Sequence, residues 1–326
     1  MKNILIFIGF IIPNIIQAQA YKKSEPLTHT YSIVARDSVT GDLGVAVQSH
    51  WFSVGSVVSY GKAGVGVVAT QSLVNPSYGP KGLALMEQGL SAQQSLEALL
   101  ANDKGEMYRQ VAFLDVSGSV ATHTGNLCID EAGHRQGKNF SVQANMMLNN
   151  TVWDAMANAF ENTNGSLSDR ILASLKAAED EKGDIRGKQS ASILIVKGQA
   201  TGNKWEDTIM DLRVEDHENP LEELDRLIQI HKAYDFMNKG DLAMEEGNSK
   251  EAEHLYLEAQ KLFPQNLEMQ YWYAINLLNN KHFNKAKPIL QSIFKKDSNW
   301  KTLTSRLVKS KLLLISEKDL VNVLKL

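Results

Sequence analysis

The sequence predicts an α+β protein in two parts: a four-layer αββα sandwich, in which a helix pair covers each outer face of two stacked antiparallel sheets, and an all-helical C-terminal region. Three observations lead to this prediction. Strand patterns and helix patterns alternate in blocks up to about residue 220. Hairpin turn signals connect neighbouring strand patterns, which argues against a parallel βαβ sheet. Beyond residue 220 the pattern is helical only and repeats after 34 residues.

A hairpin begins the sandwich. Apolar residues alternate or run continuously on both sides of a DSVTG segment, whose aspartate, threonine and glycine are typical of turns. We predict a strand over 31–36 paired with a strand over 43–48. Folding the chain about this turn places Thr30 opposite Ser49 and His50.

The other elements of the sandwich follow from the same signals. A run rich in glycine and β-branched residues predicts a buried strand, and helical spacing on either side of Gly89 predicts a helix pair whose second helix is capped by Ser91. A second hairpin turns at an SGS segment, and a second helix pair ends at Gly183. The predicted elements are a strand over 63–70, two helices within 82–102, strands over 111–116, 120–124 and 140–147, helices over 153–160 and 167–179, and a strand over 190–196.

The C-terminal region fits the tetratricopeptide pattern. In that pattern small residues at the eighth and twentieth positions let two antiparallel helices approach, and large residues fill the gap between them. In the repeat over 233–266, Gly240 and Ala252 stand at the small positions and Tyr256 at an aromatic position. Residues 267–300 repeat the pattern more loosely, and a capping helix is expected after them.

These patterns divide the chain into a sandwich domain over 21–220 and a helical domain over 221–326. Two repeats and a cap are close to the minimum that buries a core, so we expect the helical domain to pack on the sandwich. We expect residues 233–300 to hold a peptide or protein partner, and a purely structural role is the alternative.

The N-terminus predicts export. Lys2, an apolar stretch over 4–16, and the small residues Ala18 and Ala20 form the charged start, apolar middle and cleavage site of a secretory signal. We therefore expect a signal peptide over 1–20 and a periplasmic or extracellular protein. An uncleaved anchor is the alternative, but this stretch is shorter than the ~20 residues that span a bilayer, and no later segment is apolar enough to span one.

Composition and motifs exclude several classes of function. A net charge of −3 with no basic region argues against a nucleic-acid binder. No P-loop, dinucleotide-binding, zinc-protease or α/β-hydrolase motif is present. We predict no cofactor and no resident metal. The alternative, a zinc site at His123, Cys128 and His134, lacks a fourth ligand at suitable spacing, and this lone cysteine excludes an intramolecular disulfide.

The first hairpin carries the first set of candidate catalytic residues. Its register places the Thr30 hydroxyl beside a second hydroxyl, Ser49, and an imidazole, His50. Thr30 is therefore a candidate nucleophile with a base or orienting group within reach. A threonine at the start of a strand is also simply a good β-former, which is the alternative.

The loop over 183–190 carries the second set. It places Asp184, Arg186 and Ser190 between a helix and an apolar strand. Charged residues in such a loop predict a paired aspartate and arginine network, and an ordinary capped turn is the alternative.

The chain carries a series of separated motifs: TYSIVARD at 30–37, GDLGVAV at 41–47, SHWFSVG at 49–55, GVGVVATQ at 64–71, NPSYGP at 75–80, AGH at 132–134, VQANMM at 142–147, GDIRG at 183–187 and DLRVEDH at 211–217. In this order they resemble a known bacterial family, the one designated domain of unknown function 1028, which is placed in the N-terminal nucleophile hydrolase superfamily. The resemblance runs from about Thr30 to Tyr234.

The resemblance implies an N-terminal nucleophile hydrolase fold and hydrolysis of a small amide or peptide substrate. In that superfamily the first residue of the mature chain is the nucleophile, and its α-amine is the base. Thr30 matches this position. Ser49 and His50 match the strand end beside the nucleophile, and Asn145 matches the border of the site. Asp184 and Ser190 match the segment that supplies an orienting aspartate and serine.

The resemblance also implies oxyanion donors, either backbone amides around Gly64 and Gly66 or the side chain of Asn145. Sandwiches of this kind often pair, so a homodimer is one implied assembly. The sequence departs from the pattern because residues 21–29 would precede Thr30 after signal cleavage, so a second cut is needed to free its amine. The acidic residue expected near Ser49 is also absent.

Two functions follow from these observations. The first is an exported amide-bond hydrolase with Thr30 as nucleophile. The second is a non-catalytic exported binding module whose helical repeats hold a peptide or protein partner.

Overall fold

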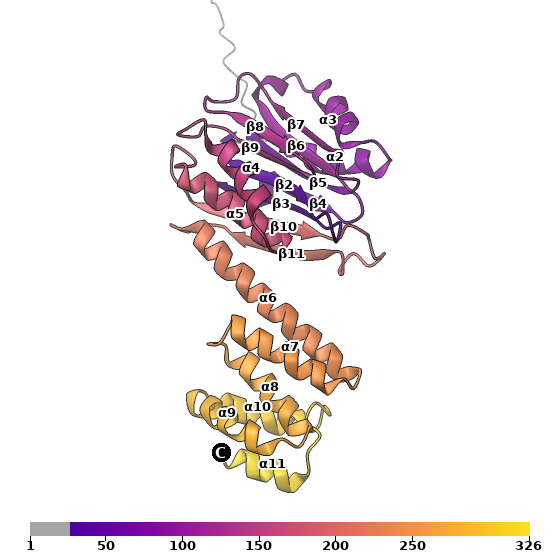
Figure 1. Cartoon of the computed structure of the whole chain (residues 1–326), viewed down its shortest axis with the longest axis vertical. Coiled ribbons are helices and arrows are strands. Elements are labelled where there is room, and N and C mark those ends of the chain that lie inside the picture. The colour runs from indigo at the N-terminus through magenta and orange to yellow at the C-terminus, as the bar shows by residue number, and fades with distance from the viewer. Residues whose placement is uncertain (1–26) are drawn as a thin grey trace, which may run out of the picture.

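The computed structural model describes residues 27–326. Two antiparallel sheets pack face to face, helices cover their outer faces, and an all-helical part follows (Figure 1). The predicted mixed α+β domain and the C-terminal helical region are therefore confirmed. The signal peptide predicted at 1–20 lies outside the described residues.

Every pairing between strands in the two sheets is antiparallel. The six-stranded sheet contains β2 (Tyr31–Arg36), β3 (Leu43–Ser49), β8 (Gly133–Gly137), β9 (Phe140–Ala144), β10 (Ser190–Val196) and β11 (Thr208–Val214). Their order is β11-β10-β3-β2-β9-β8. The five-stranded sheet contains β1 (Leu27–Thr28), β4 (Ser59–Lys62), β5 (Gly66–Leu73), β6 (Arg109–Asp115) and β7 (Val120–Thr124). Its order is β1-β5-β6-β7, with β4 also paired to β5.

The predicted register of the first hairpin is confirmed. Tyr31 pairs with Gln48 and Arg36 with Leu43, so the next residues outward are Thr30 and Ser49. Side chains along β2 and β3 point alternately to the two faces of the sheet. One set, including Ile33, packs in the core between this sheet and the helices that cover it. The other set, including Val45, packs between the sheets.

The α-helices of the sandwich are α1 (Gly55–Val58), α2 (Tyr78–Glu87), α3 (Ala92–Leu100), α4 (Val152–Asn162) and α5 (Leu167–Asp180), with a single 3₁₀ turn at Glu106–Tyr108. Helices α2 to α5 correspond to the two predicted helix pairs, whereas α1 was not predicted. Helices α2 and α3 contact the five-stranded sheet, and α4 and α5 contact the six-stranded sheet. The predicted cap is confirmed, because the Ser91 side chain accepts a hydrogen bond from the backbone N–H of Gln94.

Four strands were not predicted: β1, β4, β8 and β11. Three of them are two to five residues long, and β8 has the sequence GHRQG, which lacks the apolar residues that mark a strand. Strand β8 becomes a strand because it pairs with β9. The strand predicted over 140–147 ends earlier, at Ala144, and Met146 has a φ of 61° that an extended strand does not allow.

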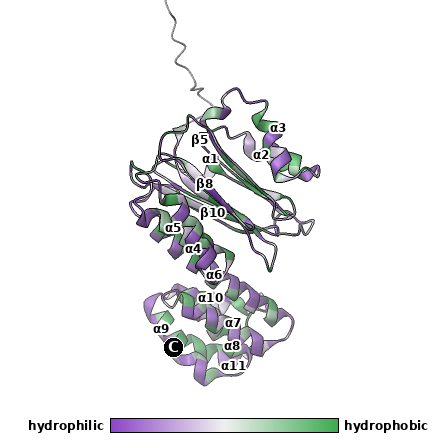
Figure 2. Ribbon diagram, turned by 45° about the horizontal axis from the view of Figure 1, so that its top comes forward, coloured by the Kyte–Doolittle hydropathy of each residue, from purple (hydrophilic) through white to green (hydrophobic). Residues whose placement is uncertain are grey.

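The helical part contains α6 (Pro220–Glu245), α7 (Ser249–Leu262), α8 (Leu267–Asn279), α9 (Phe283–Lys296), α10 (Asn299–Leu307) and α11 (Glu317–Leu324). No helix within residues 27–326 is long and apolar enough to cross a bilayer. Hydrophobic and hydrophilic residues are interspersed along these helices (Figure 2), and the buried hydrophobic residues of the repeats form two clusters. The predicted close approach is present: a Cβ atom added at Gly240 would lie 2.9 Å from the Tyr256 ring.

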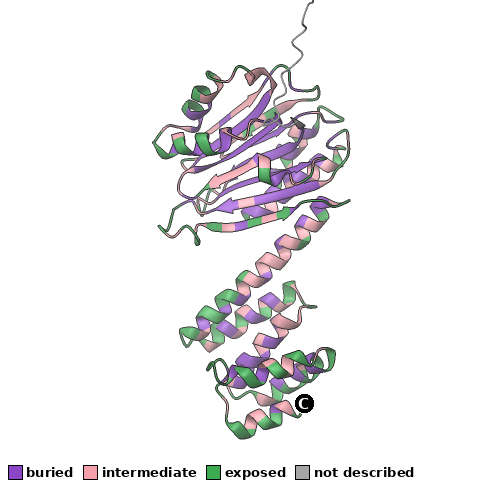
Figure 3. Cartoon of the chain, turned by 180° about the vertical axis from the view of Figure 1, so that it is seen from behind, coloured by how far each residue is buried: buried purple, intermediate pink, exposed green. Residues whose placement is uncertain are grey.

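Helix α6 belongs to both parts of the chain. Its first half, through Leu221, Leu224 and Ile228, is buried in the core of the six-stranded sheet and its helices. Its second half, from Ala233 onward, is buried against the repeats. The helical domain thus packs on the sandwich through α6, as expected, and its remaining helices extend away from the sheets (Figures 1 and 3).

The substitution Leu224→Ala tests this anchoring. It removes a fully buried side chain and leaves a cavity, so we expect the free energy of unfolding to fall by about 2–5 kcal/mol. Leu242→Ala is the control, because this leucine of the same helix is 59% exposed, and its effect should stay below about 0.5 kcal/mol. Urea unfolding followed by circular dichroism measures both, and equal losses would contradict the assigned role of Leu224.

Candidate functional site

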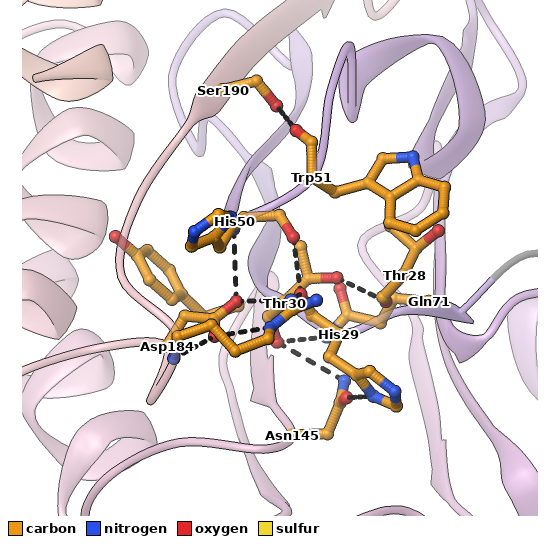
Figure 4. A network of polar contacts seen from close by, with 12 residues as sticks. Thr28, His29, Thr30, His50, Trp51, Gln71, Asn145, Asp184 and Ser190 are labelled. Carbon is orange, nitrogen blue, oxygen red and sulfur yellow. Dashed lines mark hydrogen bonds and ion pairs between the residues drawn. The ribbon is translucent and has the colours of Figure 1, made fainter. Parts of the chain in front are cut away.

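The chain passes from one sheet to the other at His29 and Thr30. Just before them, β1 pairs with β5 of the five-stranded sheet, and just after them β2 runs into the middle of the six-stranded sheet. Both residues are buried at this crossing. Buried polar groups need hydrogen-bond partners, and polar side chains from both sheets surround the crossing (Figure 4).

Thr30 is held by the main chain of Thr28 and Asn145 and by the side chain of Gln71. Its hydroxyl donates a hydrogen bond of 2.7 Å to the Thr28 carbonyl. Its carbonyl oxygen accepts from the Asn145 backbone N–H at 3.1 Å and from the Gln71 side chain at 3.2 Å. These contacts fix the threonine between the two sheets.

The His29 carbonyl oxygen, at the bond that precedes Thr30, accepts two hydrogen bonds from side chains. Ser49 Oγ donates at 2.5 Å and Arg186 Nη2 donates at 2.9 Å. A hydroxyl and a guanidinium on one carbonyl oxygen withdraw electron density from its carbon and would stabilise a negative charge on that oxygen. This arrangement polarises the His29 carbonyl group.

The His29 imidazole is neutral in this environment. Burial lowers its pKa, and the hydrogen bond with Asn145, which raises the pKa, does not offset burial. The nearby Arg186 charge lowers the pKa further. The ring Nδ1 lies 2.9 Å from Asn145 Oδ1, which can only accept, so Nδ1 carries the proton.

The predicted aspartate and arginine pair in the loop over 183–190 is confirmed. The carboxylate of Asp184 is fully buried and lies 2.7 Å from Arg186 Nη2. It also accepts from the backbone N–H groups of Arg186 and His50, at 3.0 and 3.2 Å. The fully partnered carboxylate holds the guanidinium in the position from which it donates to the His29 carbonyl.

Three predicted site residues therefore lie in one network with Thr30: Ser49, Asn145 and Asp184 (Figure 4). His50 lies beside them, but its side chain is exposed and it contributes only its backbone N–H to Asp184 among the described residues. The expectation that the His50 imidazole orients Thr30 is thus wrong. The hairpin register placed the residue correctly, but its side chain points toward solvent.

Ser190 also differs from the expectation. It pairs with Ser49 on the neighbouring strand, but its hydroxyl donates to the Trp51 carbonyl and accepts from the Val54 backbone N–H. Ser190 therefore stabilises the segment after β3, through Trp51 and Val54, and does not contact Thr30 in this network.

The glycines proposed as oxyanion donors lie elsewhere. The Gly64 N–H donates to the Lys197 carbonyl. Gly66 begins β5, and Gln71, the residue of that strand that contacts Thr30, lies near the other end. Of the donors expected from the sequence, Asn145 alone reaches the crossing.

Sequence reasoning missed His29 and two glutamines. Gln71 Nε2 donates to Gln110 Oε1 at 2.7 Å, and Gln110 Oε1 also accepts from Asn145 at 2.8 Å. Both glutamines are fully buried in central strands. A glutamine at a strand position that should be apolar is rare, and this was the available signal.

The alternative zinc site is not formed by the residues that suggested it. His123 Nε2 lies 2.9 Å from the Glu106 carbonyl, His134 Nδ1 lies 2.9 Å from Thr124 Oγ1, and Cys128 is buried beside the Arg109 carbonyl. No group of three His, Cys, Asp or Glu side chains within residues 27–326 is arranged to hold a metal ion.

The chain is similar to known proteins in both of its parts. A model of the family of unknown function DUF1028 matches residues 30–224, and a tetratricopeptide repeat model matches residues 243–307. A crystal structure of a Silicibacter pomeroyi protein of the same DUF1028 family resembles this chain with a TM-score of 0.56 and 29% sequence identity. The similarity covers 62% of this chain and 88% of that one. No curated protein matches the chain.

Removing the Arg186 guanidinium should destabilise the fold. The variant Arg186→Ala leaves a fully buried carboxylate without its cation, so we expect a loss of about 3 kcal/mol in urea unfolding. The control is Arg213→Ala, because Asp211 and Arg213 have the same spacing but are partly exposed, and that loss should be below about 1 kcal/mol. Similar losses for both would mean that Asp184 does not depend on Arg186.

Acid should weaken the fold through His29. Its folded pKa is lowered from 6.5 by burial, so the unfolded chain binds the proton first as the pH falls. The stability that neutral His29 contributes is full above pH 6.5 and decreases below it, toward the folded pKa, by up to about 1.4 kcal/mol per pH unit. Unfolding of Thr30→Ala and of the double variant Thr30→Ala with His29→Gln at pH 7.5 and 5.5 measures this in a chain that retains residue 29, and an unchanged pH dependence in the double variant would refute it.

Proposed function

This chain belongs to the family of unknown function DUF1028, and we propose that it is an exported amide-bond hydrolase of the N-terminal nucleophile type, with Thr30 as its nucleophile. The observation that carries the proposal is the His29 carbonyl oxygen, which accepts hydrogen bonds from two side chains and is followed by a buried threonine. The face-to-face sheets with helices on both outer faces support the corresponding αββα fold.

The first step releases Thr30 from the residues before it. The Thr30 hydroxyl oxygen attacks the His29 carbonyl carbon, the C–N bond breaks, and the hydroxyl proton passes to the departing nitrogen, leaving an ester. Ser49 and Arg186 stabilise the negative oxygen formed during attack. Water then hydrolyses the ester, which gives a His29 carboxylate and a threonine with a free α-amine and a free hydroxyl.

The second step uses the released amine. An α-amine has a pKa near ~8, so it is partly unprotonated at neutral pH and can accept the Thr30 hydroxyl proton. The hydroxyl oxygen then attacks a substrate amide carbonyl, the amine product leaves with the proton, and water hydrolyses the acyl-enzyme. The Asn145 backbone N–H orients Thr30 by donating a hydrogen bond to the Thr30 carbonyl oxygen. Asp184 is a positioning residue, because it holds the Arg186 guanidinium in place.

Export fits this proposal. The charged, apolar and small-residue segments of 1–20 have the order of a secretory signal. Signal cleavage would leave residues 21–29, and the step above would remove them. Fractionation of producing cells should place the mature chain in the periplasm or medium.

A second candidate function belongs to the helical domain: we infer that it holds a peptide partner. A pocket of about 320 Å³ is lined by residues of α6, α7 and α8 and by Leu312. Its walls include Trp272 and Ile275, and Asp241 and Glu245 are its charged lining residues. This combination suits a segment with both basic and apolar side chains.

The substitution Thr30→Ala tests the catalytic proposal. It removes the nucleophile, so we expect an uncut chain and a loss of at least about a thousandfold in hydrolysis of a panel of peptidyl coumarin amides. Thr30→Ser is the matched control, which should be cut and active because it keeps a hydroxyl. Intact-mass measurement locates the mature N-terminus. A wild-type chain that begins at Tyr21, with activity unchanged in Thr30→Ala, would overturn the proposal.

Charge reversal tests the helical pocket. Glu245→Lys should weaken partner binding at least about tenfold, because it puts a cation in the pocket that receives basic side chains. Glu246→Lys is the control, since this neighbour is exposed and does not line the pocket. Crosslinking and recovery of partners from the producing cells measures both, and equal recovery with the two variants would contradict the assignment.

A further inference from the structure

The segment before Thr30 occupies an open sheet edge. Strand β1 pairs antiparallel with β5, with Leu27 opposite Leu73 and Thr28 opposite Ser72. The other edge of β5 is taken by β6, and β4 pairs only with the earlier part of β5. If β1 left, the main chain at Ser72 and Leu73 would be free on that edge, which is the arrangement that receives extended peptides.

Two more features of this edge point to a ligand. Ser72, opposite Thr28, has a φ of 73° although it is not a glycine. Such strained backbone persists where the surroundings enforce it and gathers at ligand sites. Thr28 is fully buried, and its hydroxyl has no hydrogen-bond partner among the described residues. When β1 occupies this edge, the position therefore leaves a buried polar atom unsatisfied within residues 27–326.

His29, the residue just before the His29–Thr30 bond, makes more specific contacts than Thr28 does. The His29 carbonyl is held by Ser49 and Arg186, and its ring is buried with Nδ1 directed at the Asn145 side-chain oxygen. This position accepts a neutral side chain that donates a hydrogen bond. A carboxylate there would be buried against an acceptor oxygen and would be disfavoured.

We propose that the site takes an extended peptide, which adds a strand to β5 in the register of β1 and places the residue before the scissile bond where His29 lies. In the uncut chain, the residues just before Thr30 then occupy the peptide site in the way that a substrate would. The cleavage of such a peptide rests on the proposed function, whereas its binding does not.

The probe is a fluorescein-labelled peptide with the sequence YKKSEPLTH, which is that of residues 21–29. It should bind the chain that begins at Thr30, and it should bind intact Thr30→Ala at least about a hundredfold more weakly, because the tethered segment competes. Hydrogen exchange should show slower exchange at Ser72 and Leu73 when the peptide is bound.

Two control peptides separate strand pairing from general affinity. A peptide N-methylated at its leucine and threonine cannot donate main-chain hydrogen bonds from the two residues that pair with β5 and should bind at least about tenfold more weakly. A peptide that ends in aspartate instead of histidine should be weaker by a similar factor. Equal binding of all three peptides, or binding without protection of Ser72 and Leu73, would overturn the inference.

A third variant covers the case in which the shortened chain does not fold. Leu27→Pro with Thr28→Pro in intact Thr30→Ala removes the donors of β1 without shortening the chain. It should bind the labelled peptide, and failure to bind would count against the inference. Peptide binding without hydrolysis would defeat the proposed function alone. Hydrolysis of small amides without peptide binding would defeat this inference alone.

Discussion

The fully buried Asp184 carboxylate and its ion pair with Arg186 determine the geometry of the crossing between the sheets. A buried charge is tolerated only when it is paired and hydrogen-bonded, and this carboxylate is both. The pair brings a guanidinium to the His29 carbonyl oxygen, where the chain changes sheets. The polarisation of the His29 carbonyl therefore depends on a contact more than 150 residues away in sequence.

The crossing also explains why amide side chains fill the space between the sheets. A main chain that passes from one sheet to another leaves polar groups without strand partners. Gln71 and Asn145 supply hydrogen bonds to the Thr30 carbonyl, and Gln110 links the two side chains. The same network that satisfies the buried main chain also holds the proposed nucleophile in one conformation.

The helical part is coupled to this domain by the continuous helix α6. Lys232 of α6 pairs with Asp169 of α5 at 2.6 Å, and Lys176 of α5 pairs with Asp225 of α6 at the same distance. These part-exposed pairs orient the helix but contribute little energy. Burial of its first turns against the six-stranded sheet contributes more.

The sequence by itself determined the α+β class, the register of the first hairpin, the position of Thr30 beside Ser49, and the repeat helices, because each depends on local periodicity and turn chemistry. Only the tertiary structure decided that the His50 side chain is exposed and that the Ser190 hydroxyl donates its hydrogen bond to the Trp51 carbonyl. It also decided that His29 and Gln110 meet at Asn145. Side-chain directions and contacts between distant strands depend on how the sheets stack, which no local pattern encodes.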